Sequence, residues 1–351
     1  MQKIKINTID DLKNLLRINL ASAALGTALE LQLFERLSEK PLSIQDVSQV
    51  FKIPLDRCRC WLELLVGLNL LKRDNGAYSL SSVGRTTILD TYSSNTWAQL
   101  AQEARERYPI GDNLALHITH PKSVWIAQGI SSPNWFKQIQ EDPERARRFT
   151  YTLYELHQPL AETLAKTLDM EGVRRLMDLG GGSGVISLAL LKQHPNLTVT
   201  VIDIPNVCVI GREIAIKTPV ADRITYHEAD FLEDELPTGF DMILVCDAGV
   251  YNEKFFRKLF NTLKDGGYLV IVDWWNPGIT DSQPVLESSL QRLLILFEMS
   301  LGRPNMKITT STIVKNLINQ VGFIIRSEQE LEDKTVIIRA QKSPSATSGT
   351  S

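Results

Sequence analysis

A glycine-rich loop is the feature of this sequence that most restricts its fold. Residues 178–184 read Asp-Leu-Gly-Gly-Gly-Ser-Gly; they follow an apolar, β-rich run and precede residues with helical spacing. Glycine allows a sharp turn between a strand and a helix, and it lets a ligand approach the backbone with no Cβ in between. Gly180, Gly182 and Gly184 are therefore candidate ligand-binding residues, and Asp178 stands beside them.

The second half of the chain contains seven β-rich runs. They cover residues 175–179, 198–202, 224–227, 241–246, 268–273, 323–326 and 335–339. The first five alternate with helical segments, which predicts right-handed crossovers and a parallel sheet covered on both faces. The connection between the last two runs is too short for a crossover helix, so we expect an antiparallel hairpin at one edge. The predicted fold class is α/β, a Rossmann-like seven-stranded sheet with an antiparallel last strand.

The N-terminal residues predict a separate, mainly helical domain. Residues 10–37 are too apolar for a one-faced surface helix, so at least one helix there should be buried on several sides. Two helices follow, beginning near Ser43 and Pro54, and then a hairpin at 70–80 with Asn75-Gly76 in its tight turn. Helices followed by a two-stranded wing are typical of a winged helix.

A winged helix either reads DNA or joins two subunits. The helix at 55–68 has two arginines and an apolar second half, unlike a recognition helix rich in Arg, Lys, Asn and Gln. The chain has 38 Lys and Arg against 41 Asp and Glu, and a net charge of −3 disfavours a polyanionic partner. We therefore expect no nucleic-acid partner and a homodimer formed through the apolar N-terminal helices.

These patterns divide the chain into four segments. We expect a winged-helix dimerisation domain at 1–100, a helical connector contributing to the substrate pocket at 101–144, a ligand-binding α/β domain at 145–342 and a disordered tail at 343–351. Asp142-Pro143 begins one long helix, whose apolar stripe runs from Phe149 to Leu164.

The cysteines and the hydropathy pattern predict a cytoplasmic location. The four cysteines, at positions 58, 60, 208 and 246, make no disulfide framework, and free thiols fit a reducing compartment. The first residues show no signal-peptide pattern, and no apolar stretch reaches the roughly 18–20 residues that span a bilayer. We expect no membrane association.

Acidic and aromatic residues after the next two strands indicate an adenosine-containing cofactor. Asp203 ends the second strand, where a carboxylate can accept both ribose hydroxyls. Asp230 and Phe231 follow the third strand and offer an acceptor and an aromatic face to an adenine. The loop lacks the spacing of a dinucleotide site and carries Asp178 where a phosphate would favour positive charge. An acid suits a cationic ligand, so we predict S-adenosylmethionine and no metal.

At this point the sequence resembles a known family. The motifs are Asp142-Pro143-Glu144, residues 178–184, Asp203-Ile204-Pro205, Asp230-Phe231, Gly266-Gly267 and Val321-Gly322-Phe323. In this order, from about residue 12 to 341, they look like the class I S-adenosylmethionine-dependent methyltransferases of the plant caffeic-acid and acetylserotonin O-methyltransferase type. Bacteria also use this family on secondary metabolites.

The resemblance assigns roles to individual residues. It implies a homodimer, a small-molecule substrate and a methyltransferase domain at 145–342. It also implies that Gly180 and Asp203 hold the methionine end and the ribose, while Asp230 and Phe231 hold the adenine. Two further residues, Ile204 and Cys246, are expected beside the same cofactor.

The family's catalytic pattern is broken in this chain. O-methylating members carry a histidine after the fourth strand that deprotonates a phenol, but residues 245–253 contain no histidine. Of the two acids that support that base, one matches Asp273 and the other falls near Ile313, where no carboxylate occurs. A phenol with a pKa near 10 is mostly neutral at pH 7, and general-base help contributes about 10²–10⁴-fold in rate. The change favours an acceptor that needs little deprotonation, or a replacement base.

The candidates for a catalytic role are Asp247, Asp273 and His157. Asp247 and Asp273 end neighbouring strands at the sheet edge where α/β proteins place their chemistry, with a cofactor contact and a loop cap as the alternatives. His157 lies in the predicted long helix, where a structural role is the alternative. The candidate substrate-binding residues are Tyr251, Trp274 and Leu153. Tyr251 could also donate or accept a proton, and for the two aromatic residues the alternative is packing.

The sequence thus predicts an enzyme that moves a methyl group from S-adenosylmethionine to a small, aromatic or polyketide-like metabolite. The resemblance favours O-methylation, and the missing histidine leaves C- or N-methylation open. One alternative is an enzyme of the same fold that catalyses a rearrangement, elimination or hydroxylation without methyl transfer. The other is a winged-helix regulator that senses a metabolite.

Overall fold

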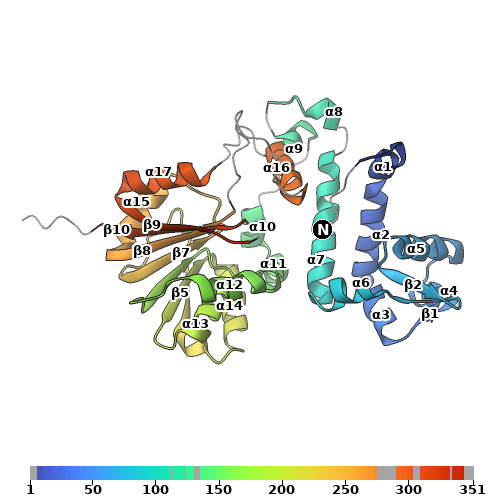
Figure 1. Cartoon of the computed structure of the whole chain (residues 1–351), viewed down its shortest axis with the longest axis horizontal. Coiled ribbons are helices and arrows are strands. Elements are labelled where there is room, and N and C mark those ends of the chain that lie inside the picture. Colours follow the sequence, from blue (N-terminus) through green and yellow to red (C-terminus); the bar gives the residue numbers. More distant parts are fainter. Residues whose placement is uncertain are drawn as a thin grey trace, which may run out of the picture. The chain divides into compact units, whose positions relative to one another are not determined.

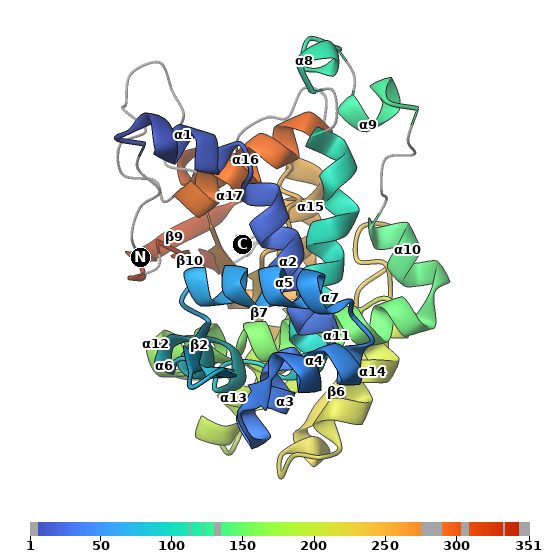
Figure 2. The same cartoon turned by 90° about the vertical axis from the view of Figure 1, so that its right-hand side faces the viewer.

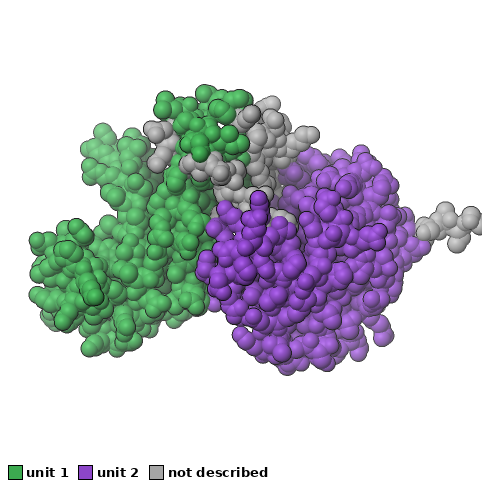
Figure 3. Space-filling view, turned by 180° about the vertical axis from the view of Figure 1, so that it is seen from behind, with its two compact units in different colours: residues 1–132, 290–304 green, residues 133–289, 305–351 purple. Residues whose placement is uncertain are grey.

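The computed structural model describes residues 6–111, 114–121, 123–129, 135–274, 290–302, 309–332 and 334–343. The chain forms two compact units, residues 1–132 with 290–304 and residues 133–289 with 305–351 (Figure 3). The tail predicted at 343–351 lies outside the described residues except for Ser343, whose hydroxyl donates to the Gly322 carbonyl at 2.9 Å.

The first unit begins with the predicted helices and wing (Figure 1). Its elements are α1 Ile9–Leu15, α2 Ile18–Glu30, α3 Leu33–Glu39, β1 Leu42–Ser43, α4 Ile44–Phe51, α5 Leu55–Gly67, β2 Leu71–Asp74 and β3 Ala77–Leu80. Ser43 caps α4 by accepting from the Asp46 N–H at 3.1 Å, and Asn75 and Gly76 take the positive φ angles of the hairpin turn. β1 adds an antiparallel third strand beside β3.

Further helices complete this unit. They are α6 Ser82–Gly84, the π-helix η1 Arg85–Leu89, α7 Ser94–Arg107, the short 3₁₀ helix η2 Tyr108–Gly111, α8 Leu114–His117, α9 Val124–Ala127 and α16 Leu290–Gly302. α7 lies alongside α2 and runs through residue 100 (Figures 1 and 2). α16 comes from much later in the chain, and its Leu301 packs against Val124 and Trp125 of α9.

The N-terminal helices expose their apolar side chains. α1 buries none of its residues, and α2 buries only Ala28 and Leu29. Leu16 is 78% exposed and Leu20 is 64% exposed. The expectation of a helix buried on several sides is not met by α1 and α2 in the described residues, because α2 packs against α7 on one side and leaves other apolar side chains exposed. It is met better by α3, which buries Leu33, Phe34 and Leu37. An apolar surface of this kind is typical of a protein–protein interface.

The second unit is built on a seven-stranded sheet in the order β6-β5-β4-β7-β8-β10-β9. The strands are β4 Arg175–Leu179, β5 Thr198–Asp203, β6 Ile224–Glu228, β7 Phe240–Cys246, β8 Leu263–Asp273, β9 Phe323–Glu330 and β10 Val336–Lys342. The first five pair in parallel, whereas β10 is antiparallel to both β8 and β9. The predicted fold class is confirmed, and the last strand lies between β8 and the edge strand β9.

Helices cover both faces of this sheet, as Figure 1 shows. One face carries α12 Gln158–Thr167, α13 Val185–Gln193 and α14 Pro205–Ala215; the other carries α15 Glu253–Thr262 and α17 Ser311–Val321. Neighbouring residues along a strand enter opposite cores: Leu176 packs with the first set and Met177 with the second. The remaining elements are α10 Trp135–Glu141, α11 Pro143–Leu156 and the 3₁₀ turn η3 Ala221–Arg223.

The long helix predicted from Asp142 is two helices. α11 ends at Leu156 and α12 begins at Gln158, with His157 as the cap residue of both. Pro159 explains the break, because proline has no N–H to donate to the carbonyl four residues earlier and its ring clashes with that carbonyl. The single-helix prediction was wrong here, and His157 lies at a junction between helices.

Candidate active site

The glycine loop takes backbone conformations that need glycine. Gly180, Gly182 and Gly184 have φ angles of 69°, 59° and 76°. The Gly180 N–H donates to the Ile202 carbonyl at 2.8 Å, which ties the loop to the end of β5. A Cβ on Gly180 would lie 3.3 Å from Cε1 of Phe231, so this ring lies directly against the loop. The structure thus brings together two predicted cofactor elements that are far apart in sequence.

Tyr226 of β6 packs against the glycine loop, a contact that the sequence analysis did not predict. Its hydroxyl donates to the Ser183 carbonyl at 2.8 Å. Cβ atoms on Gly184 and Gly211 would approach the same side chain within 2.5 and 2.2 Å. Gly211 inside α14 was the sequence signal for this contact, because a glycine in the middle of a helix often marks close packing.

Asp203 joins the loop to the end of β5. Its carboxylate accepts from the Gly182 N–H and the Ile204 N–H, each at 2.8 Å. Burial raises the pKa of Asp203 to about 6, and these two hydrogen bonds oppose the rise. A carboxylate oxygen has more than one lone-pair site, so both oxygens can accept a further hydrogen bond.

Asp178 lies beneath the loop. Its side chain is 1% exposed; Oδ2 accepts from the Ser187 hydroxyl at 2.6 Å, and Oδ1 has no hydrogen-bond partner among the described residues. A Cβ on Gly181 would come within 2.5 Å of the carboxyl carbon. Burial raises the pKa of Asp178 to about 6, and the charge of Asp203 adds to the rise. A partly unsatisfied buried acid under a glycine cradle favours a cationic ligand above it.

Hydrogen bonds within the segment stabilise the turn that contains Asp230 and Phe231. The Asp230 carboxylate accepts from the Leu232 N–H at 2.9 Å, and its own N–H donates to Asp234 Oδ2 at 2.8 Å. Lys258 of α15 donates to the Phe231 carbonyl at 2.8 Å, a support that the sequence analysis missed. These bonds fix the phenyl ring against Gly180.

A second group of side chains gathers where β7 and β8 end. The Asp247 N–H donates to the Val272 carbonyl at 3.0 Å, and Asp247 has a positive φ of 52°, uncommon outside glycine and frequent at functional sites. The Tyr251 hydroxyl donates to Oδ2 of Asp273, and the Trp274 N–H donates to Oδ1 at 2.5 Å. Both oxygens of Asp273 are thus engaged, and Tyr251 and Asp273 form a pair that the sequence analysis did not predict.

Burial perturbs the titration of these groups. Desolvation is the main cause that raises the pKa of Asp273 to about 6; the Tyr251 hydrogen bond opposes this rise, and the charge of Asp247 contributes to it. Desolvation also raises the pKa of Tyr251, and the charges of Asp273 and Asp247 reinforce this. The pKa of the Cys246 thiol is raised by burial and by nearby acids, so this residue stays a neutral thiol.

His157 and Asp247 interact across the site. Burial lowers the pKa of His157, and the charge of Asp247 opposes this. The Asp247 side chain is exposed, yet surrounding protein displaces enough water to raise its pKa, which His157 in turn lowers. The helix break thus places His157 beside the acids at the sheet edge. Leu153 lies one turn earlier, where its carbonyl accepts from the His157 N–H at 3.0 Å.

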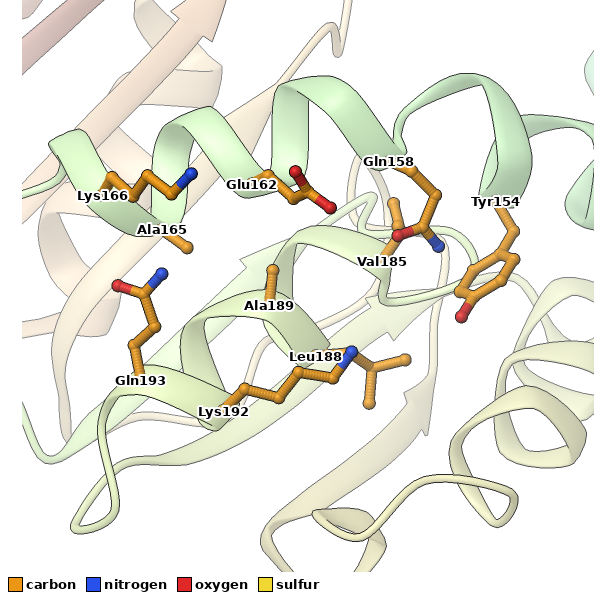
Figure 4. A pocket seen from close by; sticks show the side chains of 10 residues that line it. All are labelled: Tyr154, Gln158, Glu162, Ala165, Lys166, Val185, Leu188, Ala189, Lys192 and Gln193. Atoms are coloured by element: carbon orange, nitrogen blue, oxygen red, sulfur yellow. The ribbon is translucent and has the colours of Figure 1, made fainter. Parts of the chain in front are cut away.

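A cavity of about 170 Å³ lies between α12 and α13, away from the residues described above. Figure 4 shows Gln158, Glu162 and Lys166 of α12 opposite Lys192 and Gln193 of α13. None of the predicted site residues lines it. Within the described ranges, no group of three His, Cys, Asp or Glu side chains is arranged to hold a metal ion. No described helix is long and apolar enough to cross a membrane.

Comparison with known families decides which class of site this is. The family model of the O-methyltransferase domain matches residues 112–323, and that of the O-methyltransferase dimerisation domain matches residues 14–90. The chain belongs to the O-methyltransferase family. The predicted family, methyltransferase activity and S-adenosylmethionine cofactor are therefore confirmed.

Relatives of this chain are named for methylation of different acceptor atoms. It is 26% identical over 314 residues to the N,N-dimethyltransferase OxyT of Streptomyces rimosus, covering 88% of this chain and 89% of that one. It is 25% identical over 260 residues to the L-tyrosine C(3)-methyltransferase of Streptomyces lavendulae, covering 70% and 69%.

Solved structures share its fold. PigF, solved with S-adenosylhomocysteine (SAH), superposes with a TM-score of 0.80 at 18% identity, over 95% of this chain and all (100%) of that one. Human N-acetylserotonin methyltransferase, solved with S-adenosylmethionine (SAM), gives 0.76 at 20% identity, over 98% and 100%.

Proposed function

We propose that this chain methylates a small, aromatic or polyketide-like metabolite with the help of the residues at the carboxyl edge of β4, β5, β7 and β8. The observation that carries this proposal is the glycine loop with its acids next to a cluster of titratable side chains at one sheet edge. That edge is where open α/β sheets bind their ligands.

The residues of the loop fit S-adenosylmethionine. We assign its methionine end to Gly180, Gly182 and Gly184, whose lack of side chains leaves the backbone accessible. Asp203 is assigned to the ribose, with Ile204 and Cys246 beside the cofactor, and Asp230 and Phe231 to the adenine. Asp178 acts from beneath the loop, where its buried charge favours a cation. When bound, S-adenosylmethionine supplies an electrophilic methyl group.

We assign proton removal to His157 with Asp247. Burial keeps the imidazole neutral near pH 7, the form that accepts a proton, and Asp247 stabilises the imidazolium that results. Both oxygens of Asp273 are engaged by Tyr251 and Trp274, so Asp273 positions these two residues. Leu153, Tyr251 and Trp274 are assigned to the substrate pocket.

The N-terminal unit acts as a homodimer interface in this proposal. Support comes from the exposed apolar residues of α1 and α2 and from the match to a dimerisation domain. We further propose a cytoplasmic enzyme without a nucleic-acid partner, in line with free thiols and a net charge of −3.

The test is formation of S-adenosylhomocysteine. Purified protein is incubated with S-adenosylmethionine and a panel of aromatic and polyketide-like acceptors, with Asp203→Ala as the site-directed control. We expect one equivalent of S-adenosylhomocysteine for each acceptor consumed. Acceptor turnover without S-adenosylhomocysteine would favour the non-methylating alternative. Salt-sensitive duplex binding with no turnover would favour the regulator.

A further inference from the structure

The side chain of Tyr226 joins two parts of the proposed cofactor site that follow different strands. Tyr226 belongs to β6, the edge strand that leads into Asp230 and Phe231. Its hydroxyl donates at 2.8 Å to the carbonyl of Ser183, in the glycine loop that follows β4. Because β5 lies between β4 and β6, the side chain reaches past one strand to make this bond. Tyr226 therefore connects the strand before the adenine residues to the loop assigned to the methionine end.

Two glycines on separate elements leave space for the Tyr226 ring. A Cβ on Gly184, in the loop, would lie 2.5 Å from the hydroxyl oxygen, and a Cβ on Gly211, in α14, would overlap with Cε1. Gly184 has a φ of 76°, so its backbone needs glycine as well. Gly211 lies inside a helix, where glycine lowers helix stability relative to alanine. Space for the tyrosine ring is the reason that the structure gives for glycine at 211.

The bond from Tyr226 fixes one peptide group of the loop. The Ser183 carbonyl accepts from Tyr226, and the N–H of the same peptide group, on Gly184, donates to the Gly181 carbonyl at 2.8 Å. Burial raises the pKa of Tyr226, and the charge of Asp178 adds to the rise, so the phenol keeps the proton that it donates. Removing the hydroxyl would take a donor from a buried carbonyl, which is costly, and the loop would rearrange to recover one.

Helix α14 fixes the backbone from which this side chain extends. Arg212 Nη2 donates to the Tyr226 carbonyl at 2.9 Å, and Nη1 of the same guanidinium donates to Glu228 Oε1 at 2.7 Å. One turn earlier, Cys208 Sγ donates to the His227 carbonyl at 3.7 Å. The hydroxyl is therefore held from a fixed strand, and its position determines where the loop carbonyl lies.

We propose that Tyr226 is a positioning residue for the methionine end of S-adenosylmethionine, because its hydroxyl holds the glycine loop in the conformation that binds this part of the cofactor. The inference rests on the proposed assignment of the loop to the methionine end. Without the bond, the loop populates other conformations, and the apparent affinity falls by the fraction of chains that remain competent to bind. The adenosine part is assigned to other residues, so its binding does not depend on Tyr226.

Tyr226→Phe tests this, because it removes the hydroxyl and keeps the ring between Gly184 and Gly211. The full chain is titrated calorimetrically with S-adenosylhomocysteine and with methylthioadenosine, which has the adenosine and the sulfur but no amino-acid end. We expect the variant to bind S-adenosylhomocysteine roughly three- to tenfold more weakly, as the loss of one hydrogen bond between neutral groups implies. Its affinity for methylthioadenosine should stay within about twofold of the native value.

Tyr78→Phe is the matched control. Tyr78 lies in the first unit, is 1% exposed, and its hydroxyl donates to Glu63 Oε1 at 2.7 Å. This variant also loses one hydroxyl hydrogen bond, yet it should bind both ligands as the native chain does. Thermal unfolding of both variants checks that they fold.

Gly211→Ala is a second variant that reaches the same ring from α14. It keeps the Tyr226 hydroxyl, but the added Cβ displaces the ring that carries it. We expect the same selective loss, weaker binding of S-adenosylhomocysteine with little change for methylthioadenosine.

Unchanged binding of S-adenosylhomocysteine by Tyr226→Phe overturns the inference. An equal loss for the two ligands also overturns it, because the hydroxyl would then support the whole unit and not the methionine end. If Tyr226→Phe does not fold, Gly211→Ala decides by the same two criteria. A native chain that binds neither ligand contradicts the proposed cofactor site itself, and the inference is refuted with it.

Discussion

A substitution at Asp178 tests how much this buried carboxyl lowers the free energy of unfolding. Its carboxyl is 1% exposed, and burial raises its pKa from 3.8 to about 6. The ionised form is therefore disfavoured in the folded state by about 3 kcal/mol at pH values above 6. Asp178→Asn removes this ionisation and keeps an oxygen for the Ser187 hydroxyl.

The direction in which stability changes with pH follows from proton binding. Between about pH 4 and 6 the folded chain holds a proton on Asp178 that the unfolded chain has lost, so the contribution of Asp178 to stability falls as pH rises through this window. The asparagine variant has no such dependence. Its free energy of unfolding relative to the native chain should therefore increase by about 2.4 kcal/mol from pH 4 to pH 7.5. Any fixed effect of burying the amide is the same at both pH values and cancels.

Urea denaturation at a fixed protein concentration measures this difference, since a dimer's stability depends on concentration. Asp222→Asn, at an exposed position, is the control and should show no comparable change. A stability difference between Asp178→Asn and the native chain that does not vary with pH, or that varies in the opposite direction, would refute the argument. The variant should also bind S-adenosylmethionine more weakly, because it lacks the buried negative charge.

Three other outcomes follow from the site and the first unit. Asp203→Ala should weaken calorimetric binding of S-adenosylmethionine by about tenfold or more, since it removes charge-assisted acceptors; unchanged affinity would contradict the ribose assignment. The kcat/KM of the native enzyme should rise with pH through a pKa below 6.5, because the base must be neutral and burial lowers the pKa of His157. His157→Asn should abolish this rise of kcat/KM with pH and lower kcat/KM by about 10²-fold or more; an unchanged pH profile would exclude His157 as the base. Leu16→Lys combined with Leu20→Lys should yield monomers in light scattering, whereas Ile216→Lys, at an equally exposed site in the second unit, should leave the dimer intact.

Local patterns were enough to predict the sheet and the cofactor loop. β-rich runs alternate with helical ones, and the positions of Gly180, Gly182 and Asp203 at strand ends follow directly from the order of elements. Parallel strands that are joined by helical crossovers end at one edge of the sheet, so residues after consecutive strands are brought together by the topology itself. The predicted roles of Asp230 and Phe231 rested on the same argument, and the contact between Phe231 and Gly180 is what that argument leads one to expect.

The sequence by itself determined the fold class, the family and the position of the glycine loop, because these depend on periodicity and on residues close together along the chain. Only the tertiary structure revealed the pairing of Tyr251 with Asp273, the support from Tyr226 and the electrostatic interaction of Asp247 with His157. Each joins segments far apart in sequence, and periodicity carries no information on which distant side chains meet. The pKa values that set the chemistry depend in turn on burial, which exists only once the chain has folded.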